Sequence, residues 1–144
     1  MIIISPYSQK MRNGKRNPKN YPWFAELVAK LNQKCIQIGV LGEEPVKGTE
    51  CVFNANFDVL KQLVNDSKTW ISVDNFFPHF CHCEKLKSGI VIFSRSDPNI
   101  FSYPENINLL KDRKYLRPDQ WGIWESVEFN KEVFVSPDEV IKYI

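Results

Sequence analysis

Long apolar runs are missing from the sequence, and none approaches the roughly 18 residues that a membrane-spanning helix needs. The run from Met1 to Ile4 is short and has no charged segment before it, so it predicts a first strand rather than a signal peptide. Internal repeats, domain linkers and low-complexity tracts are missing as well. We therefore expect one globular domain over residues 1–144, cytoplasmic and without membrane contact.

Paired cysteine motifs are also absent. The four cysteines occur without a secretory signal, which favours a reducing cytosol and free thiols. The segment 79–83 reads His-Phe-Cys-His-Cys, but zinc sites usually have Cys-x2-Cys spacing, and no second pair follows. A helix would place Cys81 and Cys83 on different faces. We therefore expect no metal ion, and we interpret both cysteines as buried residues of a core helix.

Acidic residues are missing from one basic stretch. Lys10, Arg12, Lys15, Arg16 and Lys19 fall within ten residues that contain no acid. The chain has 19 Lys and Arg against 17 Asp and Glu, so without these five it keeps 14 basic residues and is slightly acidic. Three interpretations stay open: a contact with nucleic acid, a clamp on the phosphates of one small ligand, and a solvated loop.

Hydrophobic patterns alternate between strand and helix along the chain. The order β, α, β, α, β, α, β, followed by mixed elements, is typical of a parallel sheet with helices on both faces. We expect an α/β fold of the Rossmann-like three-layer α/β/α type, with a mostly parallel sheet of four to six strands. Residues 43–56 are expected to be irregular. The expected strands are 1–5, 35–41, 70–73, 90–93 and a short one within 106–110. Five helices are expected: one capped by Asn20 that reaches Gln33, one capped by Asn56, one over 77–86 ended by Gly89, one over 119–127, and one capped by Ser136.

The strongest candidate site is the stretch from Thr69 to His79. Its β-branched apolar run predicts a buried strand, Asp74 and Asn75 favour a turn or a helix N-cap, and a helix is expected to follow. In open α/β sheets, ligands bind at the carboxyl ends of strands, where the N-terminus of the next helix can receive a phosphate. We therefore expect a phosphate-bearing ligand at this turn.

Three short motifs carry a resemblance to a known family. Residues 19–22 read Lys-Asn-Tyr-Pro at a helix start, 74–79 read Asp-Asn-Phe-Phe-Pro-His after a strand, and 94–98 read Ser-Arg-Ser-Asp-Pro after the next strand. From residue 1 to about Pro104, the chain resembles the carboxyl-terminal nucleotide-sugar domain of GT-B glycosyltransferases, in particular the heptosyltransferase-like family nine. That family has Lys-x-aromatic-Pro, Asp-Ser-Gly-x-x-His and Gly-x-x-x-Pro at these places. The resemblance implies binding of a nucleotide-activated sugar through its diphosphate, with no other cofactor.

The chain departs from this family at two glycines and in its extent. Asn75 and Phe76 replace the family's Ser-Gly, which puts a large ring where backbone usually approaches a phosphate, and Ser94 replaces the glycine of the later loop. The family's enzymes carry their catalytic carboxylate on an amino-terminal domain, so this chain resembles half of such an enzyme. The resemblance therefore implies that sugar transfer requires a partner catalytic domain or a second copy of the chain, and it leaves the catalytic residue unknown.

The candidate ligand-binding residues lie at the predicted carboxyl ends of strands and in the loops that follow. The resemblance implies that Lys19 and His79 contact the diphosphate, and that Asp74 orients the turn or contacts a sugar hydroxyl. Glu43 is a candidate contact of a ribose or sugar hydroxyl, and Arg95 of a phosphate. Each candidate also has an ordinary structural interpretation. Lys19 would be a surface lysine, His79 a core histidine, Asp74 an N-cap and Glu43 a solvated acid, and the serines would bond nearby backbone. The full set is Ser5, Ser8, Lys15, Lys19, Glu43, Asp74, Asn75, His79 and Arg95.

Three function classes follow from these patterns. The first is a glycosyltransferase-like domain that binds a nucleotide-sugar and transfers the sugar only with a partner. The second is a stand-alone module that binds or sequesters a nucleotide without catalysis. The third, nucleic-acid binding through residues 10–19, ranks last because the basic residues occupy one loop rather than a face with interleaved aromatics. Trp23, Trp121 and Trp124 are interpreted as core or interface anchors.

Overall fold

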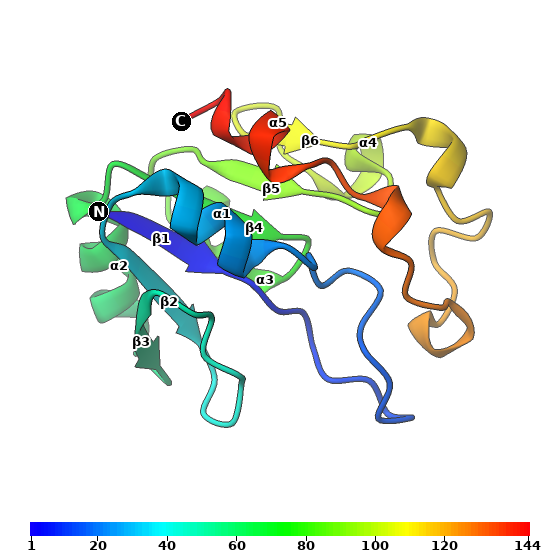
Figure 1. Ribbon diagram of the computed structural model, residues 1–144, viewed down its shortest axis with the longest axis horizontal. Coiled ribbons are helices and arrows are strands. Elements are labelled where there is room, and N and C mark those ends of the chain that lie inside the picture. The colour runs from blue at the N-terminus through cyan, green and yellow to red at the C-terminus, as the bar shows by residue number, and fades with distance from the viewer.

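A single sheet of six parallel strands runs through the computed structural model, which describes residues 1–144 (Figure 1). The strands are β1 (Ile2–Ser5), β2 (Cys35–Gly39), β3 (Thr49–Phe53), β4 (Thr69–Val73), β5 (Ile90–Ile92) and β6 (Ile107–Leu109). Their order across the sheet is β3-β2-β1-β4-β5-β6, and every neighbouring pair is parallel. The expected Rossmann-like α/β class is therefore confirmed, with a sheet that is parallel throughout.

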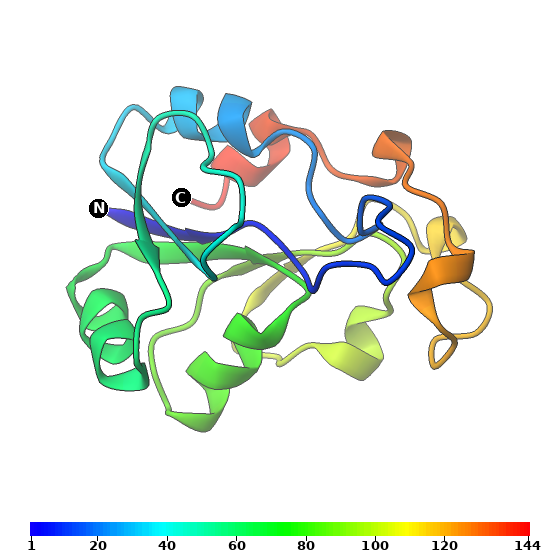
Figure 2. The ribbon, with the colours of Figure 1, turned by 90° about the horizontal axis from the view of Figure 1, so that it is seen from below.

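Helices cover both faces of this sheet, which confirms the three layers (Figure 2). The helices are α1 (Phe24–Leu31), α2 (Phe57–Asp66), α3 (Phe76–Cys83), α4 (Pro98–Phe101) and α5 (Pro137–Ile141). Ile2 and Ile4 of β1 pack in a core shared with α1 and α5, whereas Ile3 packs in a second core with α2 and α3. This division follows from the strand period, because successive side chains of a strand point to opposite faces.

The carboxyl ends of β1 and β4 mark the point where the chain changes direction across the sheet. From β1 the chain proceeds outward to β2 and β3, then crosses back to β4 on the other side of β1 and continues outward to β5 and β6. Loops that leave β1 and β4 therefore diverge, and such a switch point is where open α/β sheets form a ligand crevice. Figure 1 shows the long loop after β1 and the segment 112–127 extending beyond this edge.

The region between β2 and α2 differs from the sequence expectation. Within residues 43–56, expected to be irregular, Thr49–Phe53 forms β3, and β2 ends at Gly39 rather than at residue 41. β3 lies at the edge of the sheet and has no buried residue. Only Val52 of this edge strand packs against a core, so β3 does not need the apolar run of a central strand, and its sequence lacks that pattern.

The start of α1 is also corrected. Asn20 does not cap this helix, because its Oδ1 accepts a hydrogen bond from the Ser8 N–H at 2.8 Å and the helix begins only at Phe24. The expected caps at Asn56 and Ser136 are confirmed, since each side chain accepts a backbone N–H in the first turn of its helix. The capping pattern therefore identified two helix starts, and failed where a long loop engages the capping side chain.

Two helices expected from apolar spacing are shorter than predicted. α3 ends at Cys83, so Gly89 is not its terminus and instead precedes β5. The prediction of a helix over 119–127 is wrong, because only the single 3-10 turn Trp124–Ser126 forms there. None of the helices has the length and apolar character needed to cross a bilayer.

All four cysteines are free thiols. Cys81 is buried on α3 as expected, whereas Cys83 is exposed at the end of that helix, so its assignment to the core is wrong. Burial raises the pKa of the Cys81 thiol to about 12, which keeps it protonated and unreactive near neutral pH.

Candidate functional site

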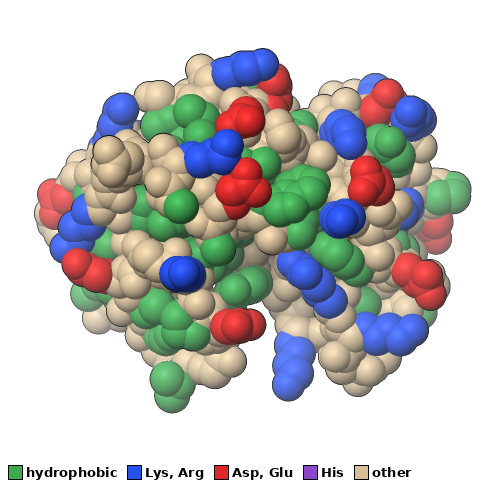
Figure 3. Space-filling view, in the orientation of Figure 1, with side chains coloured by type: hydrophobic (Ala, Val, Ile, Leu, Met, Phe, Trp, Pro, Cys, Tyr) green, Lys and Arg blue, Asp and Glu red, His purple; other side chains and the backbone are tan.

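A cavity of about 1620 Å³ opens beside the carboxyl ends of β1 and β4. Its walls come from the loop after β1, the turn after β2, the start of α3 and the segment 117–125. Figure 3 shows the molecule hollowed there, with Lys and Arg side chains along one side. Eight of the nine predicted ligand-binding residues line it, namely Ser5, Ser8, Lys15, Lys19, Glu43, Asp74, Asn75 and His79.

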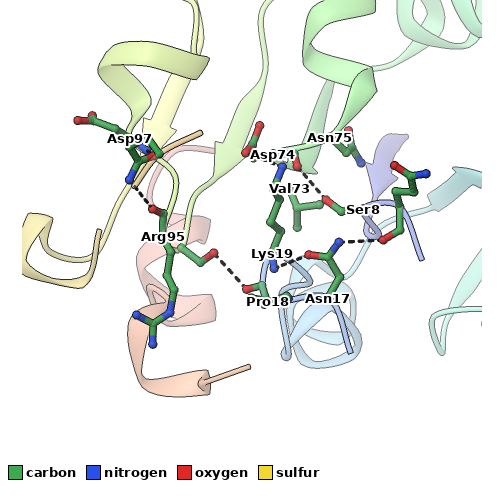
Figure 4. A network of polar contacts seen from close by, with 12 residues as sticks. Ser8, Asn17, Pro18, Lys19, Val73, Asp74, Asn75, Arg95 and Asp97 are labelled. Carbon is green, nitrogen blue, oxygen red and sulfur yellow. Dashed lines mark hydrogen bonds and ion pairs between the residues drawn. The ribbon is translucent and has the colours of Figure 1, made fainter. Parts of the chain in front are cut away.

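Lys19 and Asp74 form an ion pair in this cavity. We call these two residues, together with Arg117 and Trp124, the floor of the cavity. Lys19 Nζ lies 3.0 Å from Asp74 Oδ2, and the two side chains are only 20% and 10% exposed. β4 places Asp74 directly after its last residue, and Lys19 reaches it from the loop after β1 (Figure 4). Two residues predicted as separate ligand contacts are thus brought together and bind each other.

Ser5, Ser8 and Asn75 hold the backbone of the cavity wall. Ser8 Oγ donates to the carbonyl of Asp74 at 2.8 Å. Asn75 Nδ2 donates to Ser5 Oγ at 2.9 Å and to a carbonyl of the β1 loop, while its Oδ1 accepts a backbone N–H as the N-cap of α3. These bonds join the loop after β1 to the start of α3, so the three side chains shape the cavity through the backbone.

The ring of Trp124 contacts two cations at the cavity. Lys19 Nζ lies 5.0 Å from the ring centroid and Arg117 Cζ lies 3.7 Å from it. Arg117 is 8% exposed, and its guanidinium donates to the carbonyls of Gly122 at 2.7 Å and Gln120 at 2.8 Å. The sequence does not predict Arg117 or Trp124 as ligand-binding residues. Both lie in an irregular segment that only tertiary contacts bring to the cavity.

Positive charge exceeds negative charge along the cavity, which six Lys and Arg side chains and four Asp and Glu side chains line. Burial lowers the pKa of Arg117, with Asp119 and Asp74 acting in the opposite direction, but a guanidinium remains charged in proteins. The Arg117 guanidinium donates only to carbonyls, and Asp74 is paired with Lys19, so neither acid forms an ion pair with Arg117. Because a poorly hydrated cation is stabilised by a nearby counter-charge, the floor favours an anion.

Two buried polar atoms in the cavity wall have no partner within the protein. They are Ser96 Oγ, on a residue that is 1% exposed, and Arg117 Nε. Both residues line the cavity. Buried polar atoms are nearly always hydrogen-bonded in folded proteins, so these two atoms are exceptions within the cavity wall.

Glu43 lies in the turn after β2 and lines the cavity. Its carboxylate occupies the space above Gly39, where a β-carbon would lie 1.9 Å from Glu43 Oε2. Burial raises the pKa of Glu43, and burial together with Glu44 and Glu43 raises the pKa of Tyr7, which also lines the cavity. This end of the cavity therefore carries hydrogen-bond acceptors of the kind that bind sugar hydroxyls.

Glu43→Gln is expected to raise the melting temperature near pH 7 and to leave it unchanged near pH 4. Burial holds the pKa of Glu43 above its ordinary value of 4.5, so the folded protein binds this proton more tightly than the unfolded chain does. The stability contributed by Glu43 is therefore fully present below pH 4.5 and is lost as the pH rises through the folded pKa. Thermal denaturation at both pH values measures the effect, with the exposed neighbour Glu44→Gln as control. A destabilised Glu43→Gln protein near pH 7 contradicts it.

His79 lies in the first turn of α3 and lines the cavity. Its Nδ1 is 2.8 Å from the hydroxyl of Tyr103, while Nε2 has no hydrogen-bond partner in the protein. The sequence allowed His79 to be either a satisfied core histidine or a ligand contact. The structure is compatible with both, because one ring nitrogen is hydrogen-bonded inside the fold and the other has no partner.

Arg95 is the predicted site residue that does not line the cavity. Its Nη1 reaches the carbonyl of Tyr115 at 3.5 Å, and its own carbonyl accepts the N–H of Arg117 at 3.1 Å. Figure 4 shows its side chain directed away from Lys19 and Asp74. Arg95 therefore supports the segment that carries Arg117.

The cavity has apolar side chains at its rim as well. The rings of Phe57 and Phe76 are 59% and 54% exposed and stack with centroids 6.3 Å apart at the starts of α2 and α3. The Phe76 ring thus packs beside Phe57, on the α2 side of the turn.

In chemical terms, the cavity combines a cationic floor, unpaired donors and an acidic end. This combination suits an anionic ligand that also carries hydroxyl groups. The chain was compared with protein-family models, with curated proteins and with solved structures, and it matches none of them.

Proposed function

We propose that this chain is a glycosyltransferase-like domain that binds a nucleotide-activated sugar through its diphosphate in the cavity beside β1 and β4. One observation carries the proposal: Lys19 and Arg117 both contact Trp124, in a cavity that six Lys and Arg side chains line against four Asp and Glu. The positive charge left at this floor calls for an anionic ligand, and a diphosphate supplies oxygen atoms for several donors at once.

The loop after β1 supports a ligand with more than one negative charge. Lys10, Arg12, Lys15 and Arg16 line the cavity together with Lys19. Like charges that converge on one hollow raise the local concentration of an anion, and they repel each other until one binds. The six Lys and Arg side chains of the lining exceed its four Asp and Glu side chains by two, so a ligand with one negative charge would leave the cavity positive.

The acidic end favours hydroxyl groups at one side of the ligand. Glu43 and Glu44 line the cavity from the turn after β2. Carboxylates accept hydrogen bonds from hydroxyl groups and repel phosphates, so a diphosphate at Lys19 places a ribose or a sugar toward this turn. If the sugar is transferred, the basic side chains stabilise the leaving diphosphate, and a partner domain or second copy supplies the base.

A stand-alone nucleotide-binding module is the second candidate. The observation in its favour is that Asp74, a carboxylate only 10% exposed at the cavity floor, is already bonded to Lys19. A carboxylate held by a cation is a poor general base. Binding without catalysis is therefore a sufficient function for this cavity.

A thermal-shift series separates the two candidates. At a ligand concentration of about 100 times Kd, binding stabilises a protein by about 2.7 kcal/mol, which for a domain of this size is roughly 9 °C. We expect the largest shift with a nucleoside diphosphate sugar, a smaller one with the free nucleoside diphosphate, and the smallest with pyrophosphate. A shift with the free nucleotide at least as large as with its sugar conjugate favours the module, and no shift with any of the three rejects both.

A further inference from the structure

Tyr103 lies between the two histidines of the chain. Its hydroxyl is 2.8 Å from Nδ1 of His79, and the two rings meet edge to face with centroids 5.4 Å apart. His82, one turn further along α3, stacks on the Tyr103 ring at 3.7 Å, and its Nδ1 bonds to the carboxylate of Glu105. Tyr103 is not among the residues that line the cavity, so it contacts His79 from outside it.

The hydrogen bond between the Tyr103 hydroxyl and Nδ1 of His79 couples the hydroxyl proton to the tautomer of the imidazole. This hydroxyl has no other hydrogen-bond partner in the protein, and burial raises its pKa, so the phenol keeps its proton. A phenol that donates to Nδ1 leaves a neutral imidazole with its own proton on Nε2. Nε2 has no partner within the protein and His79 lines the cavity, so in that tautomer the Nε2–H would be a donor for a bound ligand.

We propose that Tyr103 is a positioning residue that fixes the ring of His79 with its Nε2–H available to the anionic ligand of the cavity. The inference rests on the proposed function, because it assigns one of the donors to the diphosphate. His82 and Glu105 act on Tyr103 in turn, since the stacked ring and its bond to the carboxylate restrain the tyrosine. The chain of contacts therefore runs from the surface at Glu105 to the cavity at His79.

Tyr103→Phe tests this role, because it keeps the ring and its stacking on His82 while removing the hydroxyl. Pyrophosphate affinity, measured by calorimetry, is expected to fall about three- to tenfold, the effect of one hydrogen bond. The same substitution in a His79→Phe background is expected to change nothing further, because the group that Tyr103 positions is gone. Tyr143→Phe, an exposed tyrosine near the carboxyl end, serves as the matched control.

Nitrogen-15 NMR of the imidazole rings gives a readout that does not need a ligand. With only two histidines in the chain, their signals can be assigned with one variant. We expect His79 to be protonated at Nε2 in the unaltered protein and to become a mixture of tautomers in Tyr103→Phe.

A ring protonated at Nδ1 overturns the proposal, and so does an equal loss of affinity from Tyr103→Phe with and without His79. If the unaltered protein binds neither pyrophosphate nor a nucleotide-sugar, the proposed function fails and donation to a ligand fails with it. The tautomer measurement then still decides whether Tyr103 sets the state of His79, so the two failures are distinguishable.

Discussion

Gly89→Ala is expected to destabilise the domain by about 3 kcal/mol, because the added methyl group has no room. A β-carbon at this position would lie 2.2 Å from the indole ring of Trp70. That ring is fully buried, and its Nε1–H donates to the carbonyl of Lys87 at 2.8 Å, so it has no alternative position. Thermal denaturation is expected to show a melting temperature lower by roughly 10 °C.

Gly39→Ala is the matched control for this prediction. Its β-carbon would also meet a side chain, but the nearest atom is the carboxylate end of Glu43, which can rotate away. We expect a cost of about 1 kcal/mol or less. A double variant of Gly89→Ala with Trp70→Phe should cost less than the sum of the two single changes, because the smaller ring makes room. A Gly89→Ala protein that melts at the wild-type temperature contradicts the packing seen around Trp70.

Gly89 also shows what a sequence pattern can and cannot indicate. The glycine predicts the end of a helix, yet α3 ends at Cys83. Position 89 needs a glycine because the indole ring of Trp70, on β4, leaves no room for a β-carbon. The apolar runs at Ile2–Ser5 and Ile90–Ile92 did predict central strands and hence the α/β class, because a strand buried on both faces must be apolar throughout. The edge strand β3 has no such requirement and was missed.

The site was predictable where a local rule applies. The polar turn after a buried strand located Asp74 and the N-cap at Asn75, because a helix that starts there needs an acceptor for its first N–H groups. The contact of Lys19 with the Trp124 ring, on which Arg117 also packs, could not be predicted, since about 100 residues separate Lys19 from this segment and no regular element connects them. The bond between Lys19 and Asp74 likewise depends on the path of the long loop after β1.

Removal of the Lys19 charge is expected to lower the affinity for pyrophosphate about ten- to a hundredfold, as expected for hydrogen bonds to a charged group. Lys19 is 20% exposed, so its charge is poorly screened by water and acts strongly on an anion beside it. Without it, the Asp74 carboxylate remains at the floor and repels the phosphate. Isothermal calorimetry with pyrophosphate measures the loss, and Lys19→Ala is the simplest variant.

Three further variants separate charge from packing. Lys19→Met keeps an unbranched stem beside Trp124 and should lose as much affinity as Lys19→Ala. Asp74→Asn removes the carboxylate that neutralises Lys19, so pyrophosphate should bind more tightly. Lys34→Ala, which removes a lysine paired with Glu50 at the surface, should change nothing. The two variants should change pyrophosphate affinity in opposite directions, Lys19→Met lowering it and Asp74→Asn raising it, because Asp74 and the phosphate compete for the same ammonium group. Equal losses would mean that the pair only supports the loop, and unchanged affinity in both Lys19 variants would remove the diphosphate from this floor.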